Sequence, residues 1–267
     1  MNLDDLKTMR VTTENRIATL TLQNPEALNA VGPETHRELS WVFRALADDP
    51  ASDIIILTGA GRAFCAGGNL DWMQRLAEDP TRFLPIIDEI KQIVFSMLEL
   101  PKPMICRMNG DAIGLGATLA LCCDMIVAAD TARFGDPHVR VGLTAGDGAA
   151  IVLPQVIGYM RAKELMLTGD LLSAADGKAM GLINHVVPAN ELDAKVQALA
   201  EKLARGAQQA IRFTKTALNA GLREAAGKQL DMLGGYQALT VTTPDHREAL
   251  AAMRDGRRPS FGSSRGS

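Results

Sequence analysis

Two glycine-rich turns in this chain could together hold a negatively charged oxygen. The first spans Gly59–Leu70 and the second spans Asn109–Leu119, each after an apolar segment. Glycine lets the backbone turn sharply and approach a ligand closely, and the first N–H groups of a following helix have no internal acceptor. Two such turns at one sheet edge can aim two N–H donors at one oxyanion. Ordinary tight βα turns and phosphate-binding loops are the alternatives that the residues leave open.

Known phosphate-binding patterns do not fit these turns. Phe64 stands where G-x-G-x-x-G requires its third glycine after Gly59 and Gly61, and Leu119 stands there after Gly114 and Gly116. The chain also has no G-x-x-x-x-G-K-[ST] loop and no G-x-S-x-G turn around a serine nucleophile. The pattern therefore argues against a dinucleotide site.

The elements around these turns follow a β-α-β order. Apolar periodicity, proline positions and turn residues predict a hairpin over Val11–Leu22, strands over Asp53–Thr58, Pro103–Met108 and Met125–Ala129, and helices over Pro33–Ala47, Thr81–Leu100 and Gly116–Cys123. Alternating strands and helices indicate a parallel sheet with helical crossovers. The apolar face of the Thr81–Leu100 helix is first a packing face and second a candidate pocket wall.

Helices dominate the last third of the chain. One further strand is predicted over Leu182–Val187, and helices over Glu191–Arg205, Gln208–Ala220, Leu222–Leu239 and Asp245–Arg254. We therefore expect an α/β core over residues 1–190, a helical region over 191–261, and a disordered tail over 262–267.

Bulk properties exclude several classes of protein. The net charge of −3 and pI near 5.8 argue against a nucleic-acid partner or an anionic membrane surface. Residues 1–10 do not have the pattern of a secretory signal, and no apolar run is long enough to span a bilayer. The four cysteines form no Cys-x-x-Cys pair, which favours reduced thiols and a cytoplasmic location.

Six segments together resemble the enoyl-CoA hydratase/isomerase (crotonase) family over almost the whole chain. They are, in order, Pro25–Ala30, Arg62–Leu70, Asn109–Gly116 with Cys123–Ala129, Leu167–Asp170, Ala179–Asn184 and Arg258–Phe261. The resemblance implies an α/β fold, a crotonase-like spiral of ββα units with a C-terminal helical trimerisation region. It also implies a homotrimer or dimer of trimers, an acyl-CoA thioester as substrate, and no cofactor beyond coenzyme A as part of that substrate.

The resemblance also assigns roles to residues in the two turns. It places the oxyanion donors at the backbone N–H groups of Gly68 and Leu115. Removal of one such donor typically costs about 3–4 kcal/mol of transition-state stabilisation. The positions that it implies for contacts to the substrate or its CoA are Ala27, Leu28, Arg62, Ala66, Gly67, Asn69, Leu70, Gly114, Gly116 and, from a neighbouring subunit, Lys215. An exposed loop arginine is the alternative for Arg62.

The chain departs from the family at its two catalytic glutamates. Thr118 and His138 occupy the positions where hydratases of the family carry these residues. Threonine can position a water but is no base near neutral pH, whereas histidine titrates in that range. A one-base proton shuttle, as in double-bond isomerisation, therefore fits His138 better than a two-carboxylate hydration does. A structural imidazole is the alternative.

Asp147 is the second candidate acid or base. Some isomerases and dehalogenases of the family carry an aspartate in this turn one residue earlier, where this chain has Gly146. A carboxylate that satisfies free N–H groups at a helix start is the alternative. Asp111 lies beside the second turn, where a turn-stabilising role is favoured. No two histidines have metal-ligand spacing, so we predict no metal, and Cys65 has no histidine placed to activate it.

Two classes of function stay open at this point. The leading hypothesis is an enzyme that forms a thioester enolate and hydrates or isomerises an enoyl-CoA, with thioester hydrolysis or decarboxylation as other crotonase-type reactions. The second is a CoA-binding scaffold without activity, because both glutamates are replaced. RNA binding has little support from the acidic charge balance.

Overall fold

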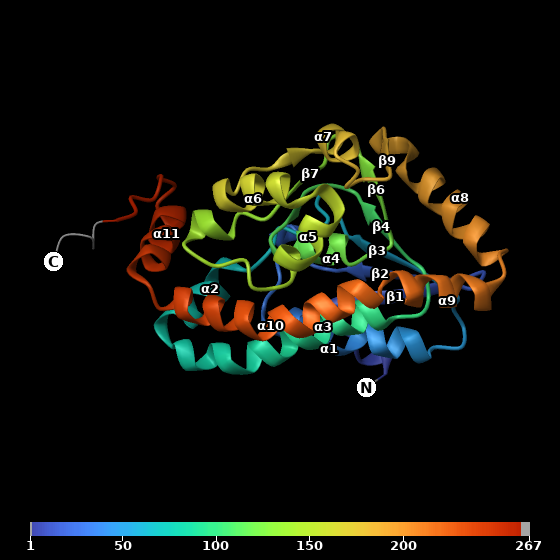
Figure 1. The fold of residues 1–267 in the computed structure, drawn as a ribbon, viewed down its shortest axis with the longest axis horizontal. Coiled ribbons are helices and arrows are strands. Elements are labelled where there is room, and N and C mark those ends of the chain that lie inside the picture. The colour runs from blue at the N-terminus through green and yellow to red at the C-terminus, as the bar shows by residue number, and fades with distance from the viewer. Residues whose placement is uncertain (1, 263–267) are drawn as a thin grey trace.

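The computed structural model describes residues 2–262 and shows one large sheet surrounded by helices (Figure 1). The large sheet has the order β1-β2-β3-β4-β6-β9, and a small second sheet has the order β5-β7-β8. The strands are β1 Met9–Glu14, β2 Ile17–Leu22, β3 Ile54–Gly59, β4 Met104–Met108, β5 Ala112–Ile113, β6 Met125–Ala129, β7 Arg133–Gly135, β8 Leu172–Ser173 and β9 His185–Val187. β1 pairs antiparallel with β2, and all other pairs in the large sheet are parallel. The predicted hairpin and parallel sheet are therefore confirmed.

Helices cover the sheet and close over its edge. They are α1 Pro33–Asp48, α2 Leu70–Glu78, α3 Leu84–Glu99, α4 Leu115–Leu121, α5 Ala149–Ile157, α6 Tyr159–Thr168, α7 Ala174–Ala179, α8 Leu192–Ala204, α9 Gln208–Leu218, α10 Ala220–Val241 and α11 Pro244–Arg254. None of the helices within residues 2–262 combines the length and the apolar character that a bilayer crossing needs.

The central strand β3 is buried on both faces. All six of its residues are buried, which explains its unbroken run of isoleucine and leucine. α8 packs across β3, β4 and β6, and the apolar residues Leu39, Phe43 and Leu46 of α1 lie in the same core. This packing fixes the strand ends from which the two glycine-rich turns leave.

The small sheet was not predicted from the sequence. Its strands have two or three residues each, too few to give an alternating pattern. β5 and β7 pair in parallel, with Ile113 opposite Gly135. This pairing brings the segment after β7 next to the second glycine-rich turn.

Two predicted boundaries change in the structure. The helix expected over Thr81–Leu100 is a 3-10 turn over Pro80–Phe83 followed by α3, because Pro85 fits only the first turn of a helix. The strand expected over Leu182–Val187 is shortened to β9. Apart from Gly262, the tail predicted to be disordered lies outside the described residues.

The last two helices pack on their own chain. α10 lies against α3 and α5, and α11 lies against α2 and the 3-10 turn His138–Val141. That the C-terminal helices also pack across subunits stays a prediction. The domain boundary at residue 190 and a role of the region in oligomerisation stay predictions.

Candidate active site

The two glycine-rich turns lie side by side. The Cys65 N–H donates to the Asp111 carbonyl at 3.0 Å, and the Ile113 N–H donates to the Cys65 carbonyl at 2.9 Å. A Cβ placed on Gly116 would lie 2.4 Å from the Cys65 carbonyl oxygen. The close contact between the turns thus requires glycine at position 116.

Each turn presents one free backbone donor. The Val31 N–H donates to Gly67 O at 2.7 Å, and the Asn69 N–H donates to Val31 O at 2.9 Å. Because both bonds face Val31, the Gly68 N–H points away from Val31. Leu115 is the first residue of α4. Within residues 2–262, neither the Gly68 N–H nor the Leu115 N–H has an acceptor.

Positive φ angles set the direction of these donors. Gly67 has φ +86° and Gly114 has φ +55°, a region in which side chains are strained. A Cβ built on either residue would lie 3.8 Å from the Cα of the other. The Gly68 and Leu115 donors therefore follow two glycines that touch each other.

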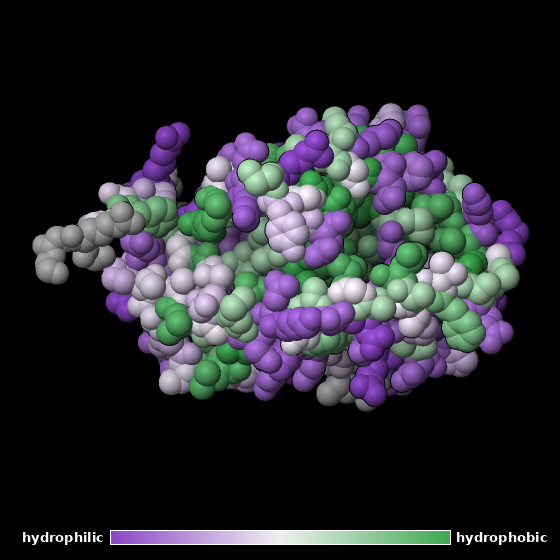
Figure 2. All heavy atoms as spheres, viewed as in Figure 1, coloured by the Kyte–Doolittle hydropathy of each residue, from purple (hydrophilic) through white to green (hydrophobic). Residues whose placement is uncertain are grey.

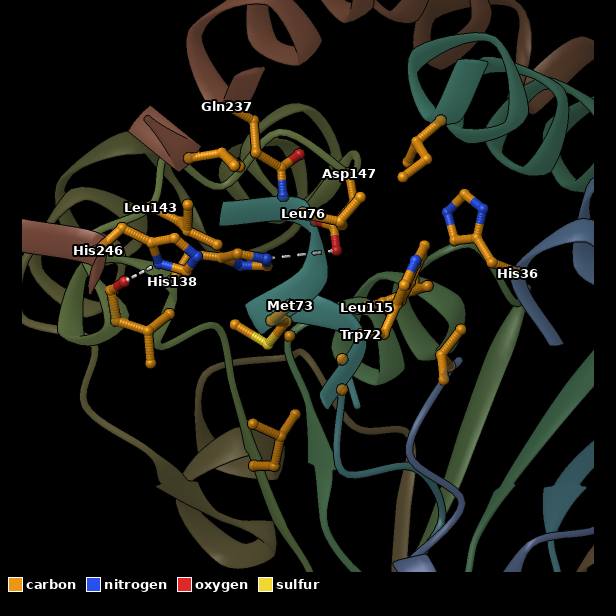
Figure 3. A pocket seen from close by; sticks show the side chains of 18 of the residues that line it. His36, Trp72, Met73, Leu76, Leu115, His138, Leu143, Asp147, Gln237 and His246 are labelled. Carbon is orange, nitrogen blue, oxygen red and sulfur yellow. Dashed lines mark hydrogen bonds and ion pairs between the residues drawn. The ribbon is translucent and has the colours of Figure 1, made fainter. Parts of the chain in front are cut away.

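A mostly apolar pocket of about 200 Å³ opens beside these donors (Figure 3). Residues from both turns, from α2, α3, α10 and α11, and from the segments after β7 and before α5 line it. They are Val31, His36, Ala66, Gly67, Gly68, Trp72, Met73, Leu76, Phe83, Ile86, Ile90, Ile113, Gly114, Leu115, Pro137, His138, Val141, Leu143, Asp147, Gln237, Val241, His246 and Met253. The predicted apolar face of α3 thus supplies part of the wall through Ile86 and Ile90.

An Asp–His–Asp chain forms the polar part of the pocket wall. The His138 Nδ1 makes a short hydrogen bond to Asp136 Oδ1, and His138 Nε2 lies 3.7 Å from Asp147 Oδ2. The Thr118 hydroxyl donates to the other Asp147 oxygen at 3.2 Å. The His138 Cε1 lies 3.5 Å from where a Gly114 Cβ would stand, so the imidazole borders the Leu115 donor.

Burial and neighbouring charges act in opposite directions on the pKa values of His138 and Asp147. Burial alone would lower the pKa of His138, but the carboxylates of Asp136 and Asp147 outweigh burial and raise the pKa to about 9. Burial also raises the pKa of Asp147, although the neighbouring His138 charge and the Thr118 hydroxyl oppose that rise. At neutral pH His138 therefore carries a proton beside a carboxyl group whose pKa is raised, an arrangement suited to acid/base chemistry.

The same three side chains have the composition of a possible cation site. Asp136, His138 and Asp147 place one ligand atom each within 4.8 Å of one another. The His138 Nδ1 already pairs with Asp136, so a metal bound to both of these groups would have to replace that hydrogen bond. The absence of a metal stays a prediction.

The structure brings seven of the residues named from the sequence to one pocket. They are Ala66, Gly67, Gly68, Gly114, Leu115, His138 and Asp147. Gly116 and Thr118 lie behind this wall, where Gly116 allows the turns to touch and Thr118 orients Asp147. Thr118 therefore does not face a water in the pocket, because its side chain is fully buried.

Ala27, Leu28, Asn69 and Leu70, which are also predicted CoA contacts, lie outside the pocket lining too. The backbone of Leu28 has a left-handed conformation, and its carbonyl accepts a hydrogen bond from the Ala66 N–H at 3.0 Å. The segment that contains Ala27 and Leu28 therefore supports the first turn. Asn69 caps α2 through Trp72 N–H at 3.0 Å. Leu70, the first residue of α2, also lies outside the lining.

The two predicted cationic contacts have different places. Arg62 is exposed in the first turn, and its CoA contact stays a prediction. The contact of Lys215 with the CoA of a neighbour also stays a prediction, and within its own chain the ammonium is buried and bound. It lies 2.7 Å from Asp124 Oδ2 and donates to Lys102 O at 2.8 Å.

Several residues of the site were not predicted from the sequence. Asp136, which lies behind the pocket lining, could have been found from its position two residues before His138. The sequence pattern places three further lining residues only within helices, namely His36, Gln237 and His246. Nothing in the local sequence shows that α1, α10 and α11 pack over the same cavity.

Two other predictions concern residues outside this chemistry. Cys65 is fully buried, and burial raises the pKa of its thiol to about 12, so it is no nucleophile. Asp111 accepts from Arg133 N–H at 3.0 Å and pairs with the Arg133 guanidinium, in the turn-stabilising role that was favoured.

A helix-covered α/β sheet with a buried acid/base pair beside free backbone donors is the architecture of a small-molecule enzyme. A family model described as Enoyl-CoA hydratase/isomerase matches residues 12–264. The chain belongs to the enoyl-CoA hydratase/isomerase family and is an enzyme of that family. This confirms the resemblance and the fold class predicted from the sequence.

Relatives named for different reactions are about equally similar to the chain in sequence. It is 34% identical over 250 residues to crotonyl-CoA hydratase of Syntrophomonas wolfei, covering 93% of this chain and 95% of the relative. It is 36% identical over 253 residues to 1,2-epoxyphenylacetyl-CoA isomerase of Escherichia coli, again covering 93% and 95%. The solved enoyl-CoA hydratase/isomerase of Mycobacterium paratuberculosis matches with a TM-score of 0.89 and 34% identity, covering 92% of this chain and 99% of the other. Overall likeness therefore leaves the reaction open.

Proposed function

We propose that this protein isomerises the double bond of an enoyl-CoA thioester through an enolate. The Gly68 and Leu115 N–H groups would bind the thioester oxygen, and the His138–Asp147 pair would move the proton. Family membership supports an acyl-CoA substrate.

The single observation that carries the proposal is the position of the acid/base pair. His138 and Asp147 lie 3.7 Å apart in the pocket wall, and His138 borders the turn that holds the Leu115 donor. A proton next to a thioester carbonyl becomes acidic only when the developing oxyanion is stabilised, so donors and base must act on one ligand. The shared pocket meets this requirement.

Asp147 is the proposed proton acceptor. In its charged form it accepts from the Thr118 hydroxyl, and the His138 cation faces its other oxygen. The carboxylate would take a proton from one carbon of the acyl chain, and the electrons of that C–H bond would move into the thioester enolate. The His138–Asp147 pair would exchange this proton with solvent and would then deliver a proton to another carbon. No water is consumed in this sequence.

Hydration is the second candidate, supported by the relatives named as hydratases. It needs a water held for attack on the β-carbon as well as a proton for the α-carbon. At the two family glutamate positions, only His138 lines the pocket, and Thr118 is buried behind it. This arrangement favours isomerisation.

Product analysis in ¹⁸O-labelled water tests this proposal. We expect a trans-3-enoyl-CoA to become a trans-2-enoyl-CoA of unchanged mass, with no label in the product. A 3-hydroxyacyl-CoA that carries ¹⁸O would contradict isomerisation and make the protein a hydratase. Binding without turnover of any thioester would leave the non-catalytic scaffold, and free CoA as product would indicate thioester hydrolysis.

The assembly and setting of the enzyme are part of the same proposal. We expect a homotrimer or dimer of trimers in the cytoplasm, without a metal or a cofactor beyond the CoA of the substrate. Exposed apolar residues on α9 and α10, among them Phe213, Leu218 and Leu239, support self-association.

A further inference from the structure

The acyl pocket contains a buried amide that the proposed chemistry does not use. Gln237 of α10 lines the pocket, and only 7% of the residue is exposed. Figure 3 shows its side chain reaching from α10 into the cavity beside Asp147. The other side chains on the nearby wall, such as Leu76 and Leu143, are apolar.

The amide has no hydrogen-bond partner within residues 2–262. Its Oε1 is fully buried and accepts no hydrogen bond, and no hydrogen bond from its Nε2 to another described residue is present. A ligand cannot reach the enclosed Oε1, but an acceptor atom of a ligand in the cavity can pair with Nε2, which gives Gln237 a means to select ligands.

The backbone opposite Gln237 is shaped to admit the amide. A Cβ built on Gly146 would lie 2.3 Å from Gln237 Oε1 and 2.7 Å from Gln237 Cβ. Any side chain at position 146 would therefore occupy the space that the amide fills. The chain thus combines glycine at 146, the carboxylate at 147 and an amide from α10 in one corner of the pocket.

The orientation of the amide defines the ligand chemistry. Its carbonyl end is enclosed against Gly146, so the NH₂ end is the one that faces the cavity. An NH₂ group donates hydrogen bonds and needs an acceptor. A plain hydrocarbon chain offers none, whereas a hydroxyl, ether, epoxide or carbonyl oxygen does.

We propose that Gln237 selects acyl-CoA substrates whose acyl group carries an oxygen atom beyond the thioester. This inference rests on the proposed function and adds a substrate class to it. Gln237 acts in recognition and takes no part in proton transfer, so helix α10 completes the specificity of the site.

Paired substrates and one isosteric variant test this inference. Wild-type protein, Gln237→Met and Gln229→Met are compared on acyl-CoA thioesters matched in chain length, with and without a hydroxyl or keto oxygen. Methionine keeps the length of the side chain but donates no hydrogen bond. Gln229 is a matched control on the same helix, outside the pocket lining.

For wild type and Gln229→Met we expect kcat/KM to be about three- to tenfold higher on the oxygenated member of each pair, the range of one neutral hydrogen bond. In Gln237→Met we expect this preference to vanish through a higher KM for the oxygenated member only. Equal losses on both members, or no preference in the wild type, would overturn the inference.

A second readout separates this inference from the proposed function. Exchange of the α-proton on the plain thioester in heavy water reports enolate formation without any acyl oxygen. Exchange without a preference for oxygenated substrates would refute only the role of Gln237. If no thioester of either kind exchanges its α-proton, the proposed function itself fails.

Discussion

The His138 imidazole lies between two carboxylates, and this position determines how the site responds to pH. Asp136 holds Nδ1 and Asp147 faces Nε2 at 3.7 Å. Although burial opposes the charged form, these neighbours raise the pKa of His138 to about 9. At neutral pH the imidazole is therefore a cation, and its charge favours the ionised form of Asp147 against the effect of burial.

This assignment predicts a bell-shaped dependence of isomerase activity on pH. Activity should fall as the pH rises through about 9, because the His138 cation is then lost. It should also fall in acid at a pH above that of an ordinary aspartate, since burial raises the pKa of Asp147. Measured kcat/KM from pH 4 to 10 checks both limbs.

The variant His138→Gln provides the control for this profile. Glutamine can donate a hydrogen bond but does not titrate, so the alkaline fall should disappear along with most of the rate. If activity of that variant still decreased in the same way at alkaline pH, the decrease would have to come from the titration of another group.

At the residue scale the sequence could indicate part of the pocket but not its full geometry. His138 and Asp147 could be named because they fall in or next to segments that match the family, and both line the pocket. Gln237 and His246 come from helices about 100 residues further along the chain, and their positions in α10 and α11 read as ordinary helix faces. Only the packing of these helices over the cavity gives them a role.

The two glycine-rich turns act as one structural element. Segment 65–66 runs parallel to 111–113, and glycine at 116 allows α4 to start directly against Cys65. The sequence predicted both turns, since glycine spacing is a local property. Their contact depends on the pairing of β3 with β4, which a parallel sheet order implies.

Substitution of Gly116 should separate the turns. A Cβ at this position would meet the Cys65 carbonyl at 2.4 Å, so the backbone must shift and the two donors must move apart. We expect Gly116→Ala to lower kcat by about 10²-fold or more, the typical effect of one lost donor, and to destabilise the fold by about 1–3 kcal/mol. Thermal unfolding and kcat measured on the same sample check both effects.

Gly227→Ala is the matched control for this substitution. Gly227 lies within α10 with nothing within 4 Å of an added Cβ, so alanine should stabilise that helix by about 0.5–1 kcal/mol and leave kcat unchanged. Wild-type kcat in Gly116→Ala would contradict the role given to the turns.

The whole molecule presents an apolar surface that a monomer would leave in water. A groove between α5 and α9 is lined by residues such as Val152, Ile211 and Leu218, and Figure 2 shows hydrophobic residues at the surface in this region. The exposed fractions of Phe213 and Leu218 are 66% and 76%. Patches of this kind mark protein interfaces in soluble proteins.

We therefore expect a trimer or hexamer that depends on this surface. Leu218→Glu should shift the protein to monomers at micromolar concentration, because a charge cannot be buried there without a partner. Mass photometry or sedimentation measures the shift, and Gln209→Glu on the same helix adds the same charge at an exposed polar position. A wild-type assembly in Leu218→Glu would place the interface elsewhere.

At this scale the sequence predicted the α/β core and the helical C-terminal region correctly. It did not predict that α10 and α11 cover the pocket of their own chain, because helix periodicity gives a buried face but not the surface that buries it. It also did not predict the ion pair of Lys215 with Asp124, because the two residues lie about 90 positions apart in the sequence.

Solvent deuterium exchange tests most directly whether this pocket forms a thioester enolate with the His138–Asp147 pair. Trans-3-enoyl-CoA is incubated in heavy water with wild type, Asp147→Asn and Asp231→Asn, whose native carboxylate pairs with Lys91 on the surface. We expect deuterium at the α-carbon with wild type and Asp231→Asn, and a rate lower by about 10²- to 10⁴-fold with Asp147→Asn. Wild-type exchange in Asp147→Asn, or double-bond migration without any deuterium uptake, would contradict the account.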